Sequence, residues 1–176
     1  MNWQQDLPTF ISPQLQPWLV DTGSMTARFK HIAGNNFSVT LLNEAIAKID
    51  NEDYSLLKIP NTEPVRVRQI YLCRHQQPWI YGKTLLPQST IDNTPYDLAN
   101  LGTKPIGSVL FANHAKRSSL SFCLLSADDF LYQQAVANLN EQPKNLWARR
   151  SIFTLQNYPL LIYEVFLPAL CRYASS

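Results

Sequence analysis

The sequence is poor in charged residues and in glycine. Only 16% of its 176 residues are charged, and only five are glycine. The 15 basic and 13 acidic residues leave a formal net charge of +2, whereas capture of a phosphate backbone needs clustered Lys and Arg. A glycine-rich phosphate loop and a Gly-x-Ser-x-Gly nucleophile motif are both absent. The sequence therefore predicts no nucleic-acid partner and gives no support to nucleotide binding or serine hydrolysis.

Cysteine and histidine are too sparse for a disulfide framework or a metal site. The cysteines Cys73, Cys123 and Cys171 are odd in number and widely spaced, which is atypical of paired disulfides and of Cys-x-x-Cys metal sites. We expect reduced thiols, with Cys73 and Cys123 in the core, because free cysteine is usually buried. The histidines lack the paired spacing of metal ligands, so we expect them in loops or on the surface. They are His31, His75 and His114.

Long apolar runs are missing as well. No stretch approaches the roughly 20 apolar residues that span a bilayer. Residues 1–8 contain no basic region followed by an apolar run, the pattern of a secretory signal. We therefore expect a cytoplasmic protein without membrane insertion.

Hydrophobic residues are abundant. They make up 45% of the chain, which is ample for a core and gives no compositional case for disorder. A length of 176 residues is near the usual size of one globular unit and leaves little room for a second core. We therefore expect a single domain over residues 1–176.

The spacing of apolar residues and of turn-forming residues predicts short helices between strands. Residues 43–64 carry mixed signals and favour no single state. Helices are expected after Ser12-Pro13, over residues 25–33 behind the cap Ser24, between Thr94 and Gly102, over 105–111 and over 128–139. Strands are expected at residues 37–42, 65–73, 79–86, 119–125, 151–156 and 160–167. The sum is an α+β fold, an antiparallel sheet of about six strands with short helices packed against it.

Two charged residues occupy positions where the strand pattern predicts apolar side chains. Alternation along residues 65–73 places Arg68 on the same face as Ile70 and Leu72. Residues 160–167 are apolar on both faces except for Glu164 at their middle. Burial of a lone guanidinium or carboxylate costs several kcal/mol, so such a group normally has a partner or a ligand. We therefore expect both side chains in the interior.

Sequence pattern alone leaves two interpretations of these charges about equal. In the first, Arg68 and Glu164 form a buried salt bridge or lie at strand ends open to water. In the second, they face a ligand pocket, where Arg offers a planar pair of donors to a carboxylate and a buried Glu bonds a hydroxyl.

Several motifs resemble successive landmarks of the chorismate lyase family. They include Arg68-Gln69-Ile70-Tyr71-Leu72-Cys73 and Leu146-Trp147-Ala148-Arg149-Arg150-Ser151. The others lie at residues 23–29, 78–79, 87–90, 101–107, 110–111 and 159–168. Each motif alone is modest, but their common order and spacing over residues 18–169 make the resemblance strong. The chain departs from the family pattern at Ile106, where leucine is usual, at Ala148, where glycine is usual, and in a longer excursion over residues 127–144.

The resemblance selects the pocket interpretation and implies an internal ligand cavity. It implies that Arg68 receives the ring carboxylate, that Glu164 faces the hydroxyl end, and that Met25 and Ile106 complete the site partly through backbone groups. By this resemblance Arg68 and Glu164 are the catalytic residues, and Met25, Arg68, Ile106 and Glu164 bind the substrate.

The activity implied by the resemblance is cleavage of chorismate to 4-hydroxybenzoate and pyruvate, the first committed step of ubiquinone biosynthesis. It needs no cofactor and no metal, because the ring becomes aromatic as the side chain leaves. The family also implies a monomer that retains its product. The alternative is a non-catalytic aromatic-acid sensor, because the fold implied here resembles the effector domain of certain transcription regulators.

Overall fold

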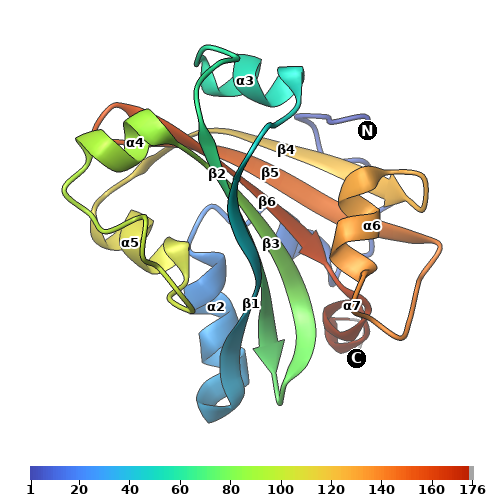
Figure 1. Ribbon diagram of the computed structural model, residues 1–176. Helices are drawn as coiled ribbons and strands as arrows, with labels where there is room; N and C mark the ends of the chain where they lie inside the picture. The colour runs from blue at the N-terminus through green and yellow to red at the C-terminus, as the bar shows by residue number, and fades with distance from the viewer. Residues whose placement is uncertain (175–176) are drawn as a thin grey trace.

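The computed structural model describes residues 1–174, which form one six-stranded antiparallel sheet with short helices around it (Figure 1). The strands are β1 (Phe37–Ala47), β2 (Val65–Arg74), β3 (Gln77–Pro87), β4 (Lys116–Ser126), β5 (Asn145–Leu155) and β6 (Tyr158–Phe166). The helices are α1 (Gln16–Leu19), α2 (Met25–Ala33), α3 (Asn51–Leu57), α4 (Gln88–Asn93), α5 (Ile106–Ala112), α6 (Phe130–Val136) and α7 (Pro168–Ala174), with a 3-10 turn at Gly34–Asn36. The predicted α+β class is confirmed.

The sheet order is β1-β2-β3-β6-β5-β4, so the two hairpins β2/β3 and β5/β6 meet at its centre. Each hairpin closes through two residues with positive φ: His75 and Gln76 in the first, Gln156 and Asn157 in the second. Two left-handed residues give the turn a twist that matches the twist of the flanking strands. The strands predicted at residues 65–73 and 79–86 are therefore confirmed, and they form a hairpin whose turn is shorter than the gap between the two predicted strands.

One predicted helix is wrong. Between Thr94 and Gly102 the chain is irregular, and the helix of this region is α4, which lies earlier and ends at Asn93. Thr94 is extended, with φ −111° and ψ 144°, because the Pro95 ring disfavours helical backbone in the residue before it. Thr94-Pro95 therefore ends a helix, whereas the sequence pattern suggested that it begins one.

The two faces of the sheet are covered differently. On one face, α3 and α6 pack with the strands into a single continuous core, which includes Tyr54, Leu131 and Tyr163. On the other face the apolar side chains form two clusters. The first gathers α1, α2 and α7 around residues such as Phe29 and Ile80, and the second gathers α5 and the β5/β6 hairpin around Leu110 and Ile162. We call these the closed face and the split face.

Within residues 1–174, no helix has the length and apolar character that a bilayer crossing needs. Cys73 and Cys123 are buried free thiols, as predicted. All three histidines are exposed, which confirms that they lie on the surface.

Candidate active site

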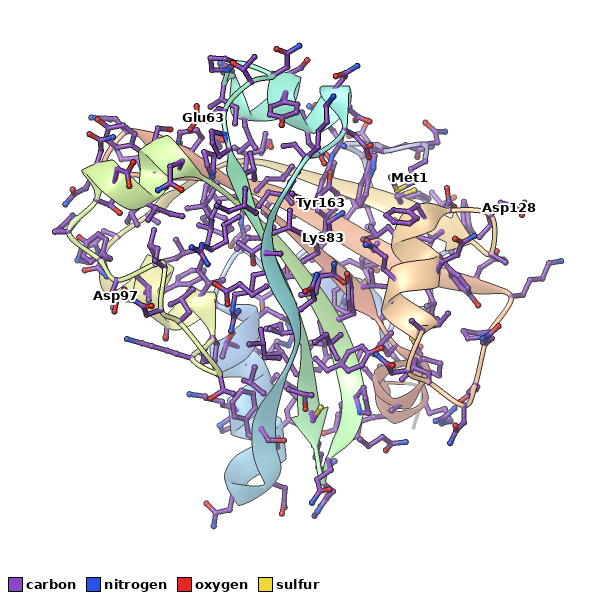
Figure 2. All side chains as sticks on the ribbon, viewed as in Figure 1. Met1, Glu63, Lys83, Asp97, Asp128 and Tyr163 are labelled. Carbon is purple, nitrogen blue, oxygen red and sulfur yellow. The ribbon has the colours of Figure 1, made fainter. Side chains whose placement is uncertain are left out.

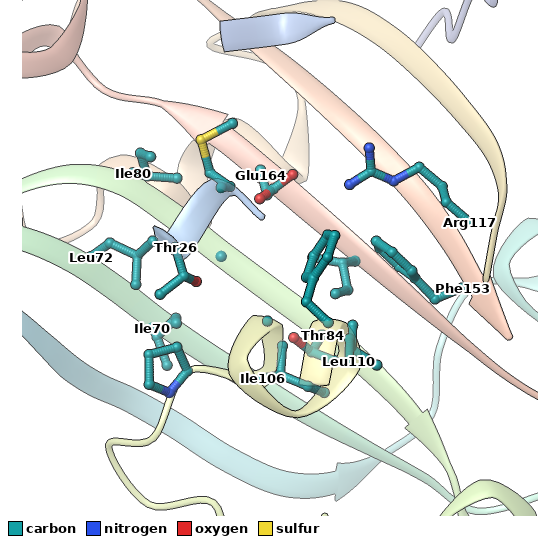
Figure 3. Close-up of a pocket in the computed structure, with 16 residues that line it drawn as sticks. Thr26, Ile70, Leu72, Ile80, Thr84, Ile106, Leu110, Arg117, Phe153 and Glu164 are labelled. Carbon is teal, nitrogen blue, oxygen red and sulfur yellow. The ribbon is translucent and has the colours of Figure 1, made fainter. Parts of the chain in front are cut away.

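A pocket lies on the split face, at the junction of its two apolar clusters (Figure 3). The volume is about 50 Å³, room for a few water-sized groups. Its floor is the sheet, and the N-terminal residues of α2 and the whole of α5 cover it. The lining residues are Met25, Thr26, Ile70, Leu72, Ile80, Gly82, Thr84, Pro105, Ile106, Gly107, Leu110, Phe111, Arg117, Phe153, Ile162 and Glu164.

Strand register places an acid at the centre of the floor. Ile70, Gly82 and Glu164 are cross-strand neighbours on β2, β3 and β6. Gly82 has no side chain, and a Cβ there would lie 3.2 Å from Ile70 Cγ1. The glycine therefore keeps the floor open beside the Glu164 carboxyl group.

Two helix starts cover the pocket. Met25 is the first residue of α2, whose cap Ser24 accepts a hydrogen bond from the Ala27 amide. Ile106 is the first residue of α5. The helices approach closely, because a Cβ on Gly107 would lie 3.0 Å from Thr26 Oγ1. Backbone N–H groups in the first turn of a helix have no partner within that helix, so Met25 and Ile106 lie where backbone donors are available to a ligand.

Arg149 holds Glu164. Its Nε donates to Glu164 Oε2 at 2.5 Å, and the two residues face each other across β5 and β6. The Arg149 side chain is fully buried, and its Nη1 donates to the backbone carbonyls of Trp18, Leu19 and Asp21. One guanidinium therefore fixes the acid and ties the C-terminal end of α1 and the residues just after it to the sheet.

Arg68 is fully buried, as predicted, but it does not line the pocket. Its Nη2 donates to the carbonyls of Gly102 and Lys104 at 2.6 and 3.2 Å, in the loop that leads into α5. Its Nε lies 3.7 Å from Glu44 Oε2. Burial lowers the pKa of Arg68, and Glu44 opposes that shift.

Arg68 is nevertheless next to the pocket wall. Its cross-strand neighbour is Thr84, a lining residue, and Ile70, two positions further along β2, is another. Nη1 and Nε are buried and find no hydrogen-bond partner among the residues that the structure describes. Buried guanidinium nitrogens normally have hydrogen-bond partners. Because these two nitrogens have none within residues 1–174, Arg68 can still donate to a ligand at this wall.

Of the predicted site residues, Met25, Ile106 and Glu164 therefore line one pocket, and Arg68 lies directly behind its wall. A buried salt bridge between Arg68 and Glu164 is not formed, because each has another partner. By ideal strand spacing their Cα atoms are about 12 Å apart, two strands and two residues from each other.

Sequence reasoning missed two residues of the site. From the sequence, Arg149 was singled out only as part of the motif over residues 146–151. In the structure it bonds loop carbonyls and also holds Glu164. Arg117 was not singled out, although its side chain reaches the pocket from β4 (Figure 3). The available signal was the run of alternating residues in β5, in which Arg149 shares a face with Ser151 and Phe153.

No group of three or more His, Cys, Asp or Glu side chains that could hold a metal ion occurs in the part of the chain that the structure describes. The pocket itself contributes one carboxylate and one guanidinium among mainly apolar residues. Its chemistry is therefore that of a site for a small, largely apolar molecule with a few polar groups.

Comparison with known proteins gives a family. Residues 1–174 match the family model described as chorismate lyase. A probable chorismate pyruvate-lyase of Nitrosospira multiformis is 33% identical over 168 residues, which are 95% of this chain and 93% of that protein. A chorismate pyruvate-lyase of an Enterobacter species is 33% identical over 159 residues, which are 90% of this chain and 86% of that protein.

Solved structures with a similar fold include an effector domain and a ligand-binding domain of regulators. The effector domain of PhnF from Mycobacterium smegmatis superposes with a TM-score of 0.61 at 12% identity, over 85% of this chain and 91% of that chain. The ligand-binding domain of a putative GntR-family regulator from Bordetella bronchiseptica gives 0.56 at 14% identity, over 75% and 84%. These similarities describe the fold alone.

Proposed function

The chain belongs to the chorismate lyase family, and from this membership we propose that it converts chorismate to 4-hydroxybenzoate and pyruvate, which opens ubiquinone synthesis. The observation that carries the proposal is the pocket on the split face. It combines apolar walls, a carboxylate held by Arg149, and the buried donors of Arg68 behind one wall. A benzoate-like ring needs this combination of an apolar slot with one polar group at each end.

In the proposed complex, Arg68 receives the ring carboxylate and Glu164 accepts a hydrogen bond from the ring hydroxyl. The bond from Arg149 Nε occupies Glu164 Oε2 and leaves Oε1 to accept from the ring hydroxyl. Met25 and Ile106 supply backbone donors at the starts of α2 and α5. The carbonyls of Gly102 and Lys104 accept hydrogen bonds from Arg68 Nη2. A small movement of this loop turns the unpaired nitrogens of Arg68 to the substrate.

The reaction needs geometry more than strong acid–base chemistry. The ring ether bond breaks, the ring loses a proton and becomes aromatic, and pyruvate leaves in its enol form before it takes its final proton on carbon. The protein holds the reactive conformer in a pocket with little room for water, and such positioning contributes roughly 7 to 11 kcal/mol in well-oriented reactions. Release of the product requires α2 and α5 to open, so we expect strong product inhibition by 4-hydroxybenzoate.

The test is to add chorismate to the purified chain and follow the ultraviolet spectrum of 4-hydroxybenzoate, with a metal chelator present. We expect conversion that the chelator does not change. Conversion that requires metal would contradict the cofactor-free reaction.

The second candidate is a non-catalytic sensor of aromatic acids, which the shared fold with effector domains favours. It predicts that the chain binds 4-hydroxybenzoate and chorismate without converting either. The same spectra, combined with calorimetric titration of both compounds, separate the two candidates.

A further inference from the structure

Arg117 is the one charged residue of the pocket lining that the proposed reaction has not used. It extends from β4 toward the Glu164 side of the pocket, over Phe153 (Figure 3). Its guanidinium carbon lies 4.8 Å from the centre of the Phe153 ring. Nη1 donates to the Asp21 carbonyl at 3.1 Å, and Nε is buried without a partner among residues 1–174. Most of the donor capacity of this guanidinium is therefore not used by the protein.

The charges around Arg117 do not balance. Arg149 pairs with Glu164, and Arg28 pairs with Asp21 at 3.0 Å. Within the described residues, no carboxylate lies within 4.0 Å of the Arg117 guanidinium nitrogens. Burial and the nearby Arg149 lower the pKa of Arg117, while Glu164 and Asp21 oppose that shift. This end of the pocket therefore holds one more guanidinium than it has carboxylates.

The opposite end has the same excess. Arg66 and Arg68 share the single carboxylate of Glu44, at 3.4 and 3.7 Å. A buried cation without its own counter-charge is costly, and a ligand anion removes that cost. One surplus positive charge thus lies at each end, Arg117 in the lining and Arg68 behind the opposite wall, which suits a ligand with two separated anionic groups.

We propose that Arg117 binds the carboxylate of the enolpyruvyl side chain of chorismate, the second anion of this substrate. This inference rests on the proposed function. The enolpyruvyl ether is attached to the ring carbon adjacent to the one that bears the hydroxyl. If Glu164 faces the hydroxyl, the side chain must lie at the Glu164 end, where Arg117 is. Arg149 is the poorer candidate, because it does not line the pocket and its Nε and Nη1 already bond Glu164 and three backbone carbonyls.

Arg117 then has a role in the chemical step. As the carbon–oxygen bond breaks, its electron pair moves to the departing oxygen. The proton lost from the ring is taken up by this oxygen, so the fragment leaves as the enol of pyruvate. The leaving fragment carries its carboxylate throughout, so a guanidinium on that carboxylate offsets the added negative charge that builds on the oxygen. Pyruvate is released from Arg117, whereas 4-hydroxybenzoate never touches it.

The test compares Arg117→Gln with Lys116→Gln, which removes the same charge from the exposed neighbouring residue on β4. For Arg117→Gln we expect kcat/KM for chorismate to fall by about 30-fold or more, the usual loss when one member of a buried charge pair is truncated. We expect the Kd for 4-hydroxybenzoate to stay within about twofold of the wild-type value, because this product lacks the second carboxylate. Arg117→Lys should recover part of the activity, and Lys116→Gln should match the wild type.

Two outcomes would overturn the inference while the proposed function stands: an unchanged kcat/KM in Arg117→Gln, or a loss of 4-hydroxybenzoate affinity as large as the loss in kcat/KM, which marks a structural role. If Arg117→Gln does not fold, Arg117→Met, which also removes the charge and keeps much of the side-chain length, is judged by the same two measurements. A wild-type chain that binds 4-hydroxybenzoate but does not convert chorismate would instead reject the proposed function, and this inference with it.

Discussion

The two faces of the sheet treat buried polar groups differently. On the closed face most of these groups have partners in the protein: the Tyr163 hydroxyl donates to Asp53, and the Tyr71 hydroxyl donates to the Ala135 carbonyl. The exception is Trp3, which packs against this core and has a buried Nε1 without a partner among the described residues. Lys83 lies beside Tyr163 on this face (Figure 2), with its amine 6.0 Å from the Tyr163 ring centre and 3.4 Å from Gln134 Oε1. On the split face, Arg68, Arg117 and Arg149 each retain a buried guanidinium nitrogen without a partner among the described residues.

Under the proposed function, this difference is a loss of stability on the split face that ligand binding offsets. Unsatisfied buried donors cost about 1 to 3 kcal/mol each, and a face built only for packing does not retain several of them. The split face keeps them at the junction of its two apolar clusters, where a ligand can satisfy them. The closed face carries the core that holds the sheet together. Removal of a charge should therefore have different effects on the two faces.

The sharpest comparison is between adjacent residues of β5 that point to opposite faces. Arg149→Met removes a fully buried guanidinium and leaves Glu164 unpaired, which should cost about 3 to 5 kcal/mol of unfolding free energy. Arg150→Met breaks the ion pair with Glu52, which is largely exposed, and should cost about 1 kcal/mol or less. Urea unfolding of both variants measures the difference. Equal costs would show that Arg149 does not organise the split face.

A second comparison concerns the two ends of the pocket. Arg68→Ala should reduce chorismate turnover by about 100-fold or more, because it removes the proposed carboxylate anchor from a fully buried position. Glu164→Gln keeps the shape and an acceptor oxygen for the hydroxyl, so it should lose clearly less. Steady-state kinetics checks both, with circular dichroism to establish that each variant is folded. Small and equal losses would count against both assignments.

The floor of the pocket allows a change of size rather than of charge. Gly82→Ala places a methyl group 3.2 Å from Ile70 Cγ1 and beside Glu164. Overpacking of this kind typically costs 1 to 3 kcal/mol, so we expect the affinity for 4-hydroxybenzoate to fall by about tenfold. The double variant with Ile70→Ala recreates the space and should recover much of that affinity in titration calorimetry. Failure of this rescue would mean that Gly82 is needed for the backbone conformation and not for the space that the ligand occupies.

Much of the fold followed from local pattern. The hairpin over residues 65–86 and the helix over 25–33 were predictable because turn residues, the Ser24 cap and apolar spacing all act locally. β1 was harder, because residues 43–47 are mostly exposed and are strand only through pairing with β2. The register slips between Leu41 and Asn43, which breaks the alternation that a sequence pattern can detect. β5 likewise starts six residues before its prediction, at Asn145.

The site was predictable in part for a related reason. Glu164 and Arg68 stood out because each interrupts an apolar pattern. The resemblance to the chorismate lyase family, which the motif order suggested, is confirmed by the family match. Arg117 gave no such signal, and the alternation along β5 placed Arg149 on a face without indicating its partners. Their roles depend on contacts with Asp21 and Glu164 across distant parts of the chain, and such contacts leave no local spacing.

The smallest effect expected comes from the closed face and concerns pH. Asp53 is almost fully buried on α3, and burial raises the pKa of its carboxyl group above 3.8 despite the hydrogen bond from Tyr163. The folded state therefore binds this proton more tightly than the unfolded state. As the pH rises from about 3.8 through the raised value, the free energy of unfolding falls, and it stays lower above that window.

Asp53→Asn removes this titration and keeps an acceptor for the Tyr163 hydroxyl. Relative to the wild type, the variant should therefore gain stability as the pH rises through the window, and the gain should level off above it. Urea unfolding at a series of pH values measures the difference, and Asp50→Asn, an exposed neighbour, is the control that should show a smaller change. Parallel curves for the wild type and Asp53→Asn would mean that the closed face tolerates the ionised carboxylate without cost, and the contrast between the two faces would then rest on the guanidinium groups alone.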